Sequence, residues 1–389
     1  SAPLIADRAY FIAGDAGVPK HRQYRLACDC SSYGRSILVH CTGTMAASDD
    51  QRNRSRGQRE EISLYCRTPL IESLTLQGRH LPGVPVYLKL ENTQPTGSFK
   101  MRGLSRLCQH GVQSGHDTLV TSSGGNAGLA VAHSARRLGV KARVYVPEKT
   151  SRAVVEALEQ EGANVIATGS VWDDADIAAR DYVKIQGGYY CHPFDNPIVW
   201  SGHASMIVEA DEDLSRRGVT KPSAVVTCAG GGGLLCGIME GMHRVGWTDV
   251  PVLVMETRGA ASFRAARDAG RPVAISAMTS VAVTLGALTV CQRAVDLLHS
   301  HPIISELVTD RQAVDACFKF ADDHRMLVEP SCGATLAALY SGLAARLYAE
   351  GKLSRTGGPL LLIVCGGSAA SLGAFQRWRE IVDQKVEDE

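Results

Sequence analysis

The sequence Glu91-Asn-Thr-Gln-Pro-Thr-Gly-Ser-Phe-Lys-Met-Arg-Gly103 connects a predicted strand, residues 85–90, to a predicted helix that begins near Lys100. Pro95 and Gly97 interrupt the chain between the two elements. Lys100 falls in the first turn of the helix, where the helix dipole disfavours a cation. The side chain therefore either points into water, as most lysines do, or is a desolvated amine that can form a Schiff base with a carbonyl cofactor. The stretch alone leaves both possibilities open.

Length and composition favour a soluble protein of two lobes. The chain has 389 residues, of which 45% are hydrophobic and 21% charged, enough for a large core. A net charge of +1 without blocks of like charge argues against nucleic-acid and membrane-surface partners. The longest apolar runs, such as residues 359–365, are too short to span a bilayer. Twelve scattered cysteines without a CxxC pair are interpreted as reduced thiols of a cytoplasmic protein, not as a zinc site.

The first 60 residues differ from the rest of the chain. They show no sustained helical or strand period, and a polar run follows Met45. We expect residues 1–60 to be a disordered or non-native extension, with the folded protein starting near Glu60. A weak organelle transit peptide is the alternative.

From Tyr65 onward, short apolar runs alternate with helical segments. Strands are expected at residues 84–90, 119–121, 142–146, 164–168, 224–228, 252–256 and 360–365. Helices are expected at residues 127–138, 151–161, 173–186, 204–216, 234–245, 311–324 and 334–349. This alternation predicts an α/β fold with mostly parallel sheets flanked by helices. Such sheets bind ligands beyond the carboxyl ends of their strands.

Three glycine-rich segments follow predicted strands. Residues 121–128 (Thr-Ser-Ser-Gly-Gly-Asn-Ala-Gly) lead into a helix, whose first N–H groups can bind an anion; a tight turn is the alternative use of these glycines. Residues 228–235 (Cys-Ala-Gly-Gly-Gly-Gly-Leu-Leu) hold four consecutive glycines, which favours backbone that approaches a phosphate over packing alone. This loop matches neither the Walker motif nor the dinucleotide fingerprint. Residues 363–368 end a strand in a thiol and two glycines.

Together and in this order, these motifs resemble the pyridoxal-phosphate enzymes of the tryptophan synthase β-subunit fold, or fold type II. Within that group the sequence is most similar to the eukaryotic L-serine/L-threonine dehydratases. The similarity covers about residues 68–379, including residues 193–205 (Pro-Phe-Asp-Asn-Pro-Ile-Val-Trp-Ser-Gly-His-Ala-Ser) and 328–334 (Val-Glu-Pro-Ser-Cys-Gly-Ala). It implies a large cofactor-binding domain of residues 61–93 and 200–389, a small domain of residues 94–199, and pyridoxal phosphate between the two lobes.

The resemblance also implies roles for individual residues. Lys100 would hold the cofactor and then remove the Cα proton, Phe99 would pack against the cofactor ring, and Asn126 would donate a hydrogen bond to its phenolic oxygen. Cys365 would face the pyridine nitrogen, with room for the ring beside Gly366 and Gly367; an ordinary core cysteine is the alternative. The cofactor phosphate would be bound by Gly230, Gly231, Gly232, Gly233 and Leu234, and the substrate carboxylate by Ser123, Gly124, Asn126 and Ala127.

A monovalent-cation site is a further expectation from the resemblance. It would consist of Glu256, Ala260 and Ser262, completed by the backbone carbonyls of Leu285 and Ala287. Ser262 stands where the related racemases carry an aspartate, which favours potassium over a divalent ion. The alternative is that Glu256 is a carboxylate that caps a helix.

Gly124 bears on the reaction type. The related serine racemases carry a serine at this position, two residues before the asparagine, which can return a proton to the opposite face of the substrate. We therefore expect a cytoplasmic, homodimeric ammonia-lyase that converts L-serine to pyruvate and L-threonine to 2-oxobutanoate, and we expect Gly124→Ser to raise racemisation. The glycine resembles the serine dehydratase-like branch, in which a more mobile loop would lower activity. A serine racemase and a weakly active cofactor-binding paralogue are the alternatives.

Overall fold

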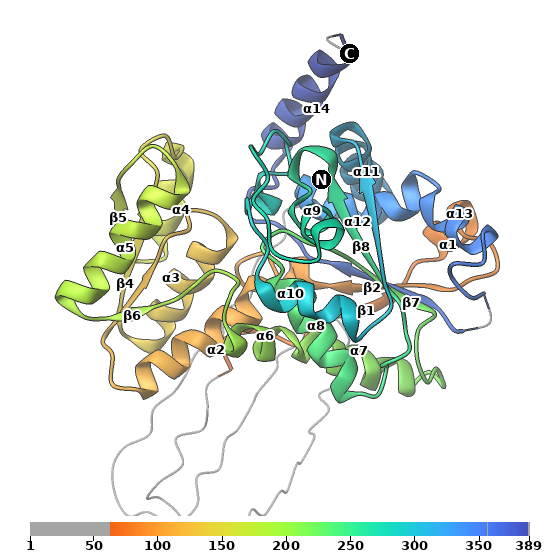
Figure 1. Ribbon diagram of the computed structural model, residues 1–389, viewed down its shortest axis with the longest axis horizontal. Coiled ribbons are helices and arrows are strands. Elements are labelled where there is room, and N and C mark those ends of the chain that lie inside the picture. The colour runs from red at the N-terminus through yellow and green to blue at the C-terminus, as the bar shows by residue number, and fades with distance from the viewer. Residues whose placement is uncertain (1–62, 356, 388–389) are drawn as a thin grey trace, which may run out of the picture. The chain divides into compact units, whose positions relative to one another are not determined.

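The described part of the chain is built on two β-sheets with helices around them (Figure 1). The computed structural model describes residues 63–355 and 357–387. Both sheets belong to one compact unit, Ile62–Glu389. The extension expected over residues 1–60 lies outside the described residues.

The larger sheet has six strands in the order β1-β2-β10-β7-β8-β9. β10 (Leu360–Val364) is central and runs parallel to β2 (Val86–Leu90) on one side and to β7 (Ala224–Cys228) on the other. Every residue of these three strands is buried, as expected for parallel strands covered on both faces. The other strands are the parallel β8 (Val252–Thr257) and β9 (Ile303–Val308) and the antiparallel edge strand β1 (Leu70–Glu72).

The smaller sheet is entirely parallel, with the order β5-β4-β3-β6. Its strands are β3 (Thr118–Thr121), β4 (Lys141–Val146), β5 (Asn164–Ala167) and β6 (Tyr189–Tyr190). The helices α3 (Asn126–Leu138), α4 (Arg152–Gln160) and α5 (Trp172–Gln186) pack against these strands. All four strands lie within residues 94–199, but the exact domain boundaries stay a prediction.

Eleven further helices of four residues or more complete the described chain. They are α1 (Leu74–His80), α2 (Lys100–Gln113), α6 (Pro197–His203), α7 (Ser205–Ser215), α8 (Gly233–Arg244), α9 (Ser262–Ala269), α10 (Gln292–Asp296), α11 (Asp310–His324), α12 (Pro330–Tyr340), α13 (Leu343–Ala349) and α14 (Leu372–Glu387). None of the helices among the described residues is long and apolar enough to cross a bilayer.

The helix that begins at Lys100 crosses α6 at close range because both helices carry a glycine at the contact. A Cβ atom on Gly103 would lie 2.5 Å from the carbonyl oxygen of Val199, and one on Gly202 would lie 2.6 Å from that of Arg102. Real Cβ atoms do not approach a carbonyl oxygen so closely, so a larger residue would push the helices apart. Since α6 also packs on α8, these two glycines help to set the position of Lys100 relative to the tetraglycine loop.

Most expected elements are present, and the differences have local causes. The helix expected over residues 334–349 is interrupted at Gly342, which adopts a left-handed conformation with φ 78° and separates α12 from α13. The helix expected over residues 204–216 begins at Ser205, directly after α6. The strands β1, β6 and β9 were not expected: β1 and β6 have only three and two residues, and β9 is half-buried at the sheet edge.

Candidate active site

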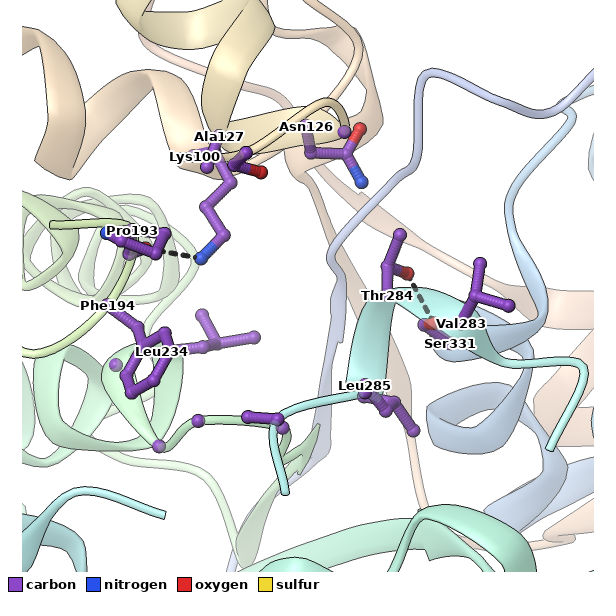
Figure 2. A pocket seen from close by; sticks show the side chains of 18 of the residues that line it. Lys100, Asn126, Ala127, Pro193, Phe194, Leu234, Val283, Thr284, Leu285 and Ser331 are labelled. Carbon is purple, nitrogen blue, oxygen red and sulfur yellow. Dashed lines mark hydrogen bonds between the residues drawn. The ribbon is translucent and has the colours of Figure 1, made fainter. Parts of the chain in front are cut away.

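A single cavity of about 790 Å³ collects most of the predicted site residues. It lies where the loops after β3, β7 and β10 meet the start of α2, as expected for ligand sites of parallel sheets. Figure 2 shows Lys100, Phe194 and Leu234 on one side of this space and Asn126 and Thr284 on the other. The predicted residues that line it are Phe99, Lys100, Ser123, Gly124, Asn126, Ala127, Gly230, Gly231, Gly232, Gly233, Leu234, Leu285, Ala287 and Cys365.

Lys100 is placed by hydrogen bonds between two distant motifs. The backbone N–H of Phe99 donates to the carbonyl oxygen of Cys365 over 3.1 Å, and Ser98 forms an isolated antiparallel bridge with Gly366. The Lys100 ammonium donates to the carbonyl oxygen of Pro193 over 2.7 Å (Figure 2). Burial lowers the pKa of Lys100 from 10.5 to about 8. The desolvated amine, one of the two possibilities considered for this residue, is thus the one that the geometry favours.

The tetraglycine loop, residues 230–233, is constrained by the residues packed against it as well as by the turn from strand to helix. A Cβ atom on Gly231 would lie 2.5 Å from the ring of Phe194, and one on Gly230 would lie 3.0 Å from the backbone of Leu285. Gly232 has φ +90° and forms the N-cap of α8. Packing therefore accounts for more of these glycines than expected from the sequence. The first N–H groups of α8 lack intrahelical acceptors, so they are free to bind a phosphate.

Cys365 lies at the end of the central strand with its sulfur 3.7 Å from that of Cys228. Hydrogen bonding with Cys228 and Cys332, together with burial, raises the pKa of the Cys365 thiol well above its usual value. The described cysteines form no disulfides. Cys365 is therefore a neutral thiol in the cavity, available as a weak partner for a ring nitrogen.

The two glycines after Cys365 lie close to other protein atoms. A Cβ atom on Gly366 would lie 2.2 Å from the carbonyl oxygen of Gly97, and one on Gly367 would lie 2.2 Å from Cγ of Glu329. Both glycines have positive φ, +96° and +136°. Contacts with protein atoms therefore require both glycines, and Gly366 also lines the cavity, so room for a ring beside it stays a prediction.

Gly124 lines the cavity with its backbone, but its missing side chain would point elsewhere. A Cβ atom there would lie 3.1 Å from Cγ1 of Val146, with Val154 and Thr150 next nearest. None of these three residues is among those that line the cavity. A serine at this position would therefore first meet β4 and α4, contrary to the expectation that it would supply a proton donor to the cavity.

Of the proposed cation ligands, Leu285 and Ala287 line the cavity, whereas Glu256, Ala260 and Ser262 lie outside its lining. The Glu256 carboxylate accepts hydrogen bonds from the backbone N–H groups of Phe263 and Arg264 over 2.8 and 2.9 Å and so caps α9. Burial raises the pKa of Glu256 to about 7. The hydroxyl of Ser262 donates to the carbonyl oxygen of Gly230 over 3.4 Å. Within residues 63–355 and 357–387, no cluster of three or more His, Cys, Asp or Glu side chains could hold a metal. The cation site, including Ala260, stays a prediction.

Sequence reasoning assigned no role to several cavity residues, of which Glu329 is the most notable. Glu329 is buried, with 3% of its surface exposed, and it accepts hydrogen bonds from Asn126, Thr284 and the backbone of Ala369. It belongs to the quoted segment at residues 328–334. An acidic residue between Val328 and Pro330 at the start of an apolar helix was the available signal.

The sequence matches the family described as pyridoxal-phosphate dependent enzyme over residues 63–366. The chain belongs to this family of pyridoxal-phosphate dependent enzymes. Among its relatives, "Serine dehydratase-like" of Mus musculus is 50% identical over 309 residues, which is 79% of this chain and 92% of the relative. "L-serine dehydratase/L-threonine deaminase" of Homo sapiens is 45% identical over 318 residues, 82% of this chain and 95% of the relative. The crystal structure of a fungal L-serine ammonia-lyase from Rhizomucor miehei superimposes with a TM-score of 0.75 at 34% identity, over 82% of this chain and 99% of that one.

The cavity of this pyridoxal-phosphate enzyme fits its cofactor. The Lys100 amine has a lowered pKa, the start of α8 offers backbone N–H groups in a loop whose glycines have no space for side chains, and the Cys365 thiol is neutral. These three features match the aldehyde, the phosphate and the pyridine nitrogen of pyridoxal phosphate in turn. The fold is that of fold type II, as expected from the motifs.

Proposed function

We propose that this chain is an ammonia-lyase that converts L-serine to pyruvate and ammonia, and L-threonine to 2-oxobutanoate and ammonia. The observation that carries the proposal is the position of the Lys100 amine, which lines the cavity and donates a hydrogen bond to Pro193, in a chain whose relatives are named serine dehydratase-like, L-serine dehydratase/L-threonine deaminase and L-serine ammonia-lyase. The bound cofactor supplies the electron sink and the carbonyl group that captures the substrate amine.

The protein's own residues would bind and orient the amino acid. The Ser123 hydroxyl and the backbone N–H groups of Asn126 and Ala127 at the start of α3 would donate hydrogen bonds to the substrate carboxylate, because a helix N-terminus favours an anion. Lys100 Nζ would accept the Cα proton in its unprotonated form. The hydrogen bond to Pro193 would hold this nitrogen in place. Loss of the β-hydroxyl then requires no second base on the opposite face.

A serine racemase is the second candidate, and the relatives disfavour it, because those at 50% and 45% identity are named serine dehydratase-like and L-serine dehydratase/L-threonine deaminase. Gly124 does not decide between the two, because a side chain at this position would point at β4 and α4 and not into the cavity. The racemase structures that resemble this chain, such as that of maize serine racemase at 22% identity, share the fold alone. A weakly active paralogue is the third candidate, since a relative at 50% identity is named serine dehydratase-like.

Product analysis of L-serine turnover by the holoenzyme separates the three candidates. An ammonia-lyase forms pyruvate and ammonia in equal amounts with almost no D-serine. A racemase would form mainly D-serine, and a cofactor-binding protein without turnover would form neither. D-serine should also be a poor substrate, because its Cα proton points away from Lys100.

The same proposal includes a homodimer in the cytoplasm and a potassium ion at Glu256, Ala260, Ser262, Leu285 and Ala287. The absence of disulfides among the described cysteines supports a reducing compartment. Sedimentation of the holoenzyme tests the homodimer.

A further inference from the structure

Glu329 occupies the N-cap position of α12 but does not cap that helix with its side chain. A carboxylate at this position ordinarily accepts hydrogen bonds from the next N–H groups of its own helix. Here it accepts them from three other segments instead: from the backbone N–H of Ala369 over 2.9 Å, from the Thr284 hydroxyl over 2.7 Å and from the Asn126 amide over 3.2 Å. The Glu329 carboxylate therefore bonds to residues around the cavity and not to the N–H groups of its own helix.

The amide of Asn126 is oriented by this carboxylate and by Ser368. The backbone N–H of Ser368 can only donate, so the atom 2.8 Å from it must be the acceptor Oδ1 of Asn126. The Ser368 hydroxyl donates to the same oxygen over 2.7 Å. The Nδ2 group must then face Glu329, and one of its two N–H bonds remains for a ligand in the cavity. Asn126 is thus held at both ends of its amide.

The donor set around Glu329 fits an ionised carboxylate. Burial raises its pKa, whereas the hydrogen bonds from Ala369, Thr284 and Asn126 oppose that rise. Of these three partners only the Thr284 hydroxyl could accept a hydrogen bond from a neutral carboxyl group. The backbone after Cys365 also fits closely against the Glu329 side chain, because any residue larger than glycine at position 367 would collide with Cγ of Glu329.

We propose that Glu329 is a positioning residue that acts through Asn126: it fixes the amide so that one Nδ2–H bond points at the cofactor. Figure 2 shows Asn126 facing the cavity across from Lys100, where a cofactor held by Lys100 would lie. The proposal rests on the cofactor of the family and not on the choice of amino-acid substrate. The role of Glu329 would therefore be unaffected if the proposed reaction were wrong.

The test uses Glu329→Gln, Asn126→Ala and the double variant as full-length holoenzymes without substrate. Two properties are measured: the position of the visible absorbance band of the bound cofactor, and the dissociation constant for pyridoxal phosphate. In Glu329→Gln, an NH₂ group replaces one of the two oxygens that face Asn126 Nδ2 at 3.2 and 3.4 Å, so the Asn126 amide keeps a single, uncharged acceptor and is held less firmly. We expect the band to shift and cofactor binding to weaken by roughly tenfold, the effect of one lost hydrogen bond to a charged group.

The double-mutant comparison decides whether the effect passes through Asn126. In the Asn126→Ala background, Glu329→Gln should change the band and the dissociation constant less than twofold further. Equal effects of Glu329→Gln in both backgrounds, or no effect in the presence of Asn126, would overturn the proposal.

Thr284→Val is the matched control, because it removes another donor to the same carboxylate and leaves Asn126 untouched. Its cofactor band should stay in place; a shift as large as that of Glu329→Gln would mean general loosening of the loops and would refute the route through Asn126. If Glu329→Gln does not fold, Ser368→Ala tests the other end of the amide. A smaller band shift that disappears in the Asn126→Ala background supports the proposal, and a shift that persists there contradicts it.

Discussion

Lys100 is the residue whose chemistry depends most on its surroundings. With the pKa lowered by burial from 10.5 to about 8, the unprotonated fraction near pH 7 is roughly 300-fold larger than for an exposed lysine. Only the unprotonated amine attacks an aldehyde. We therefore predict that the rate at which the cofactor-free protein captures pyridoxal phosphate rises as the pH increases through about 8 and levels off above it. Stopped-flow absorbance measures this rate. A midpoint near 10.5 would show that burial does not lower this pKa.

Gly124 lies too close to its neighbours for a side chain to be added without cost. An added Cβ atom would meet Val146 at 3.1 Å, so Gly124→Ser and the matched variant Gly124→Ala should both lose stability, by up to about 1–3 kcal/mol. Because that Cβ atom points at β4 and α4, neither variant should gain racemase activity. Thermal unfolding and chiral analysis of serine check both points. D-serine formed by Gly124→Ser but not by Gly124→Ala would mean that the hydroxyl does reach the cavity.

Helix α2 is anchored by a buried cluster of opposite charges just after Lys100. The Arg102 guanidinium bonds to Glu91 over 2.6 Å and to Glu209 over 2.7 Å, and Lys89 bonds to Glu209 over 2.6 Å. Removing Arg102 leaves two buried carboxylates with one cation. Arg102→Met should therefore lower the free energy of unfolding by about 3–5 kcal/mol in urea titrations.

A matched control for this cluster is Arg152→Met, which breaks an exposed pair with Glu156. Exposed pairs are screened by water and salt, so this variant should change stability little. Similar losses of unfolding free energy in the two variants would show that burial does not increase the contribution of the Arg102 cluster to stability.

The elements that the sequence predicts well are those whose signal is local. A few consecutive residues are enough to recognise the five apolar residues of β10 and the glycine-rich loops that follow strands. In contrast, β6 has two residues and exists only because β3 lies beside it. Glu329 could not be assigned a role, since its partners Asn126, Thr284 and Ala369 are 203, 45 and 40 residues away in the chain. The direction of a side chain at Gly124 likewise depends on the fold around it.

At the scale of the whole molecule, the loops of both sheets must meet around one ligand, and a cation beneath the tetraglycine loop would stiffen that arrangement. Ser262 already bonds to the carbonyl oxygen of Gly230. If the cation site exists, activity should fall severalfold when potassium is replaced by a bulky organic cation, and Glu256→Gln should remove this dependence. Equal initial rates in potassium, sodium and the organic cation would rule the site out.

Lys100 is the residue that we expect to hold pyridoxal phosphate in this cavity. Borohydride reduction of the holoenzyme makes a carbon–nitrogen bond to the cofactor permanent, and peptide mass spectrometry then identifies the modified lysine. We predict that the cofactor mass is found on the peptide that contains Lys100, and that Lys100→Ala lacks both this peptide adduct and turnover of L-serine. Cofactor found on a different lysine, or normal turnover by Lys100→Ala, would show that Lys100 does not hold the cofactor.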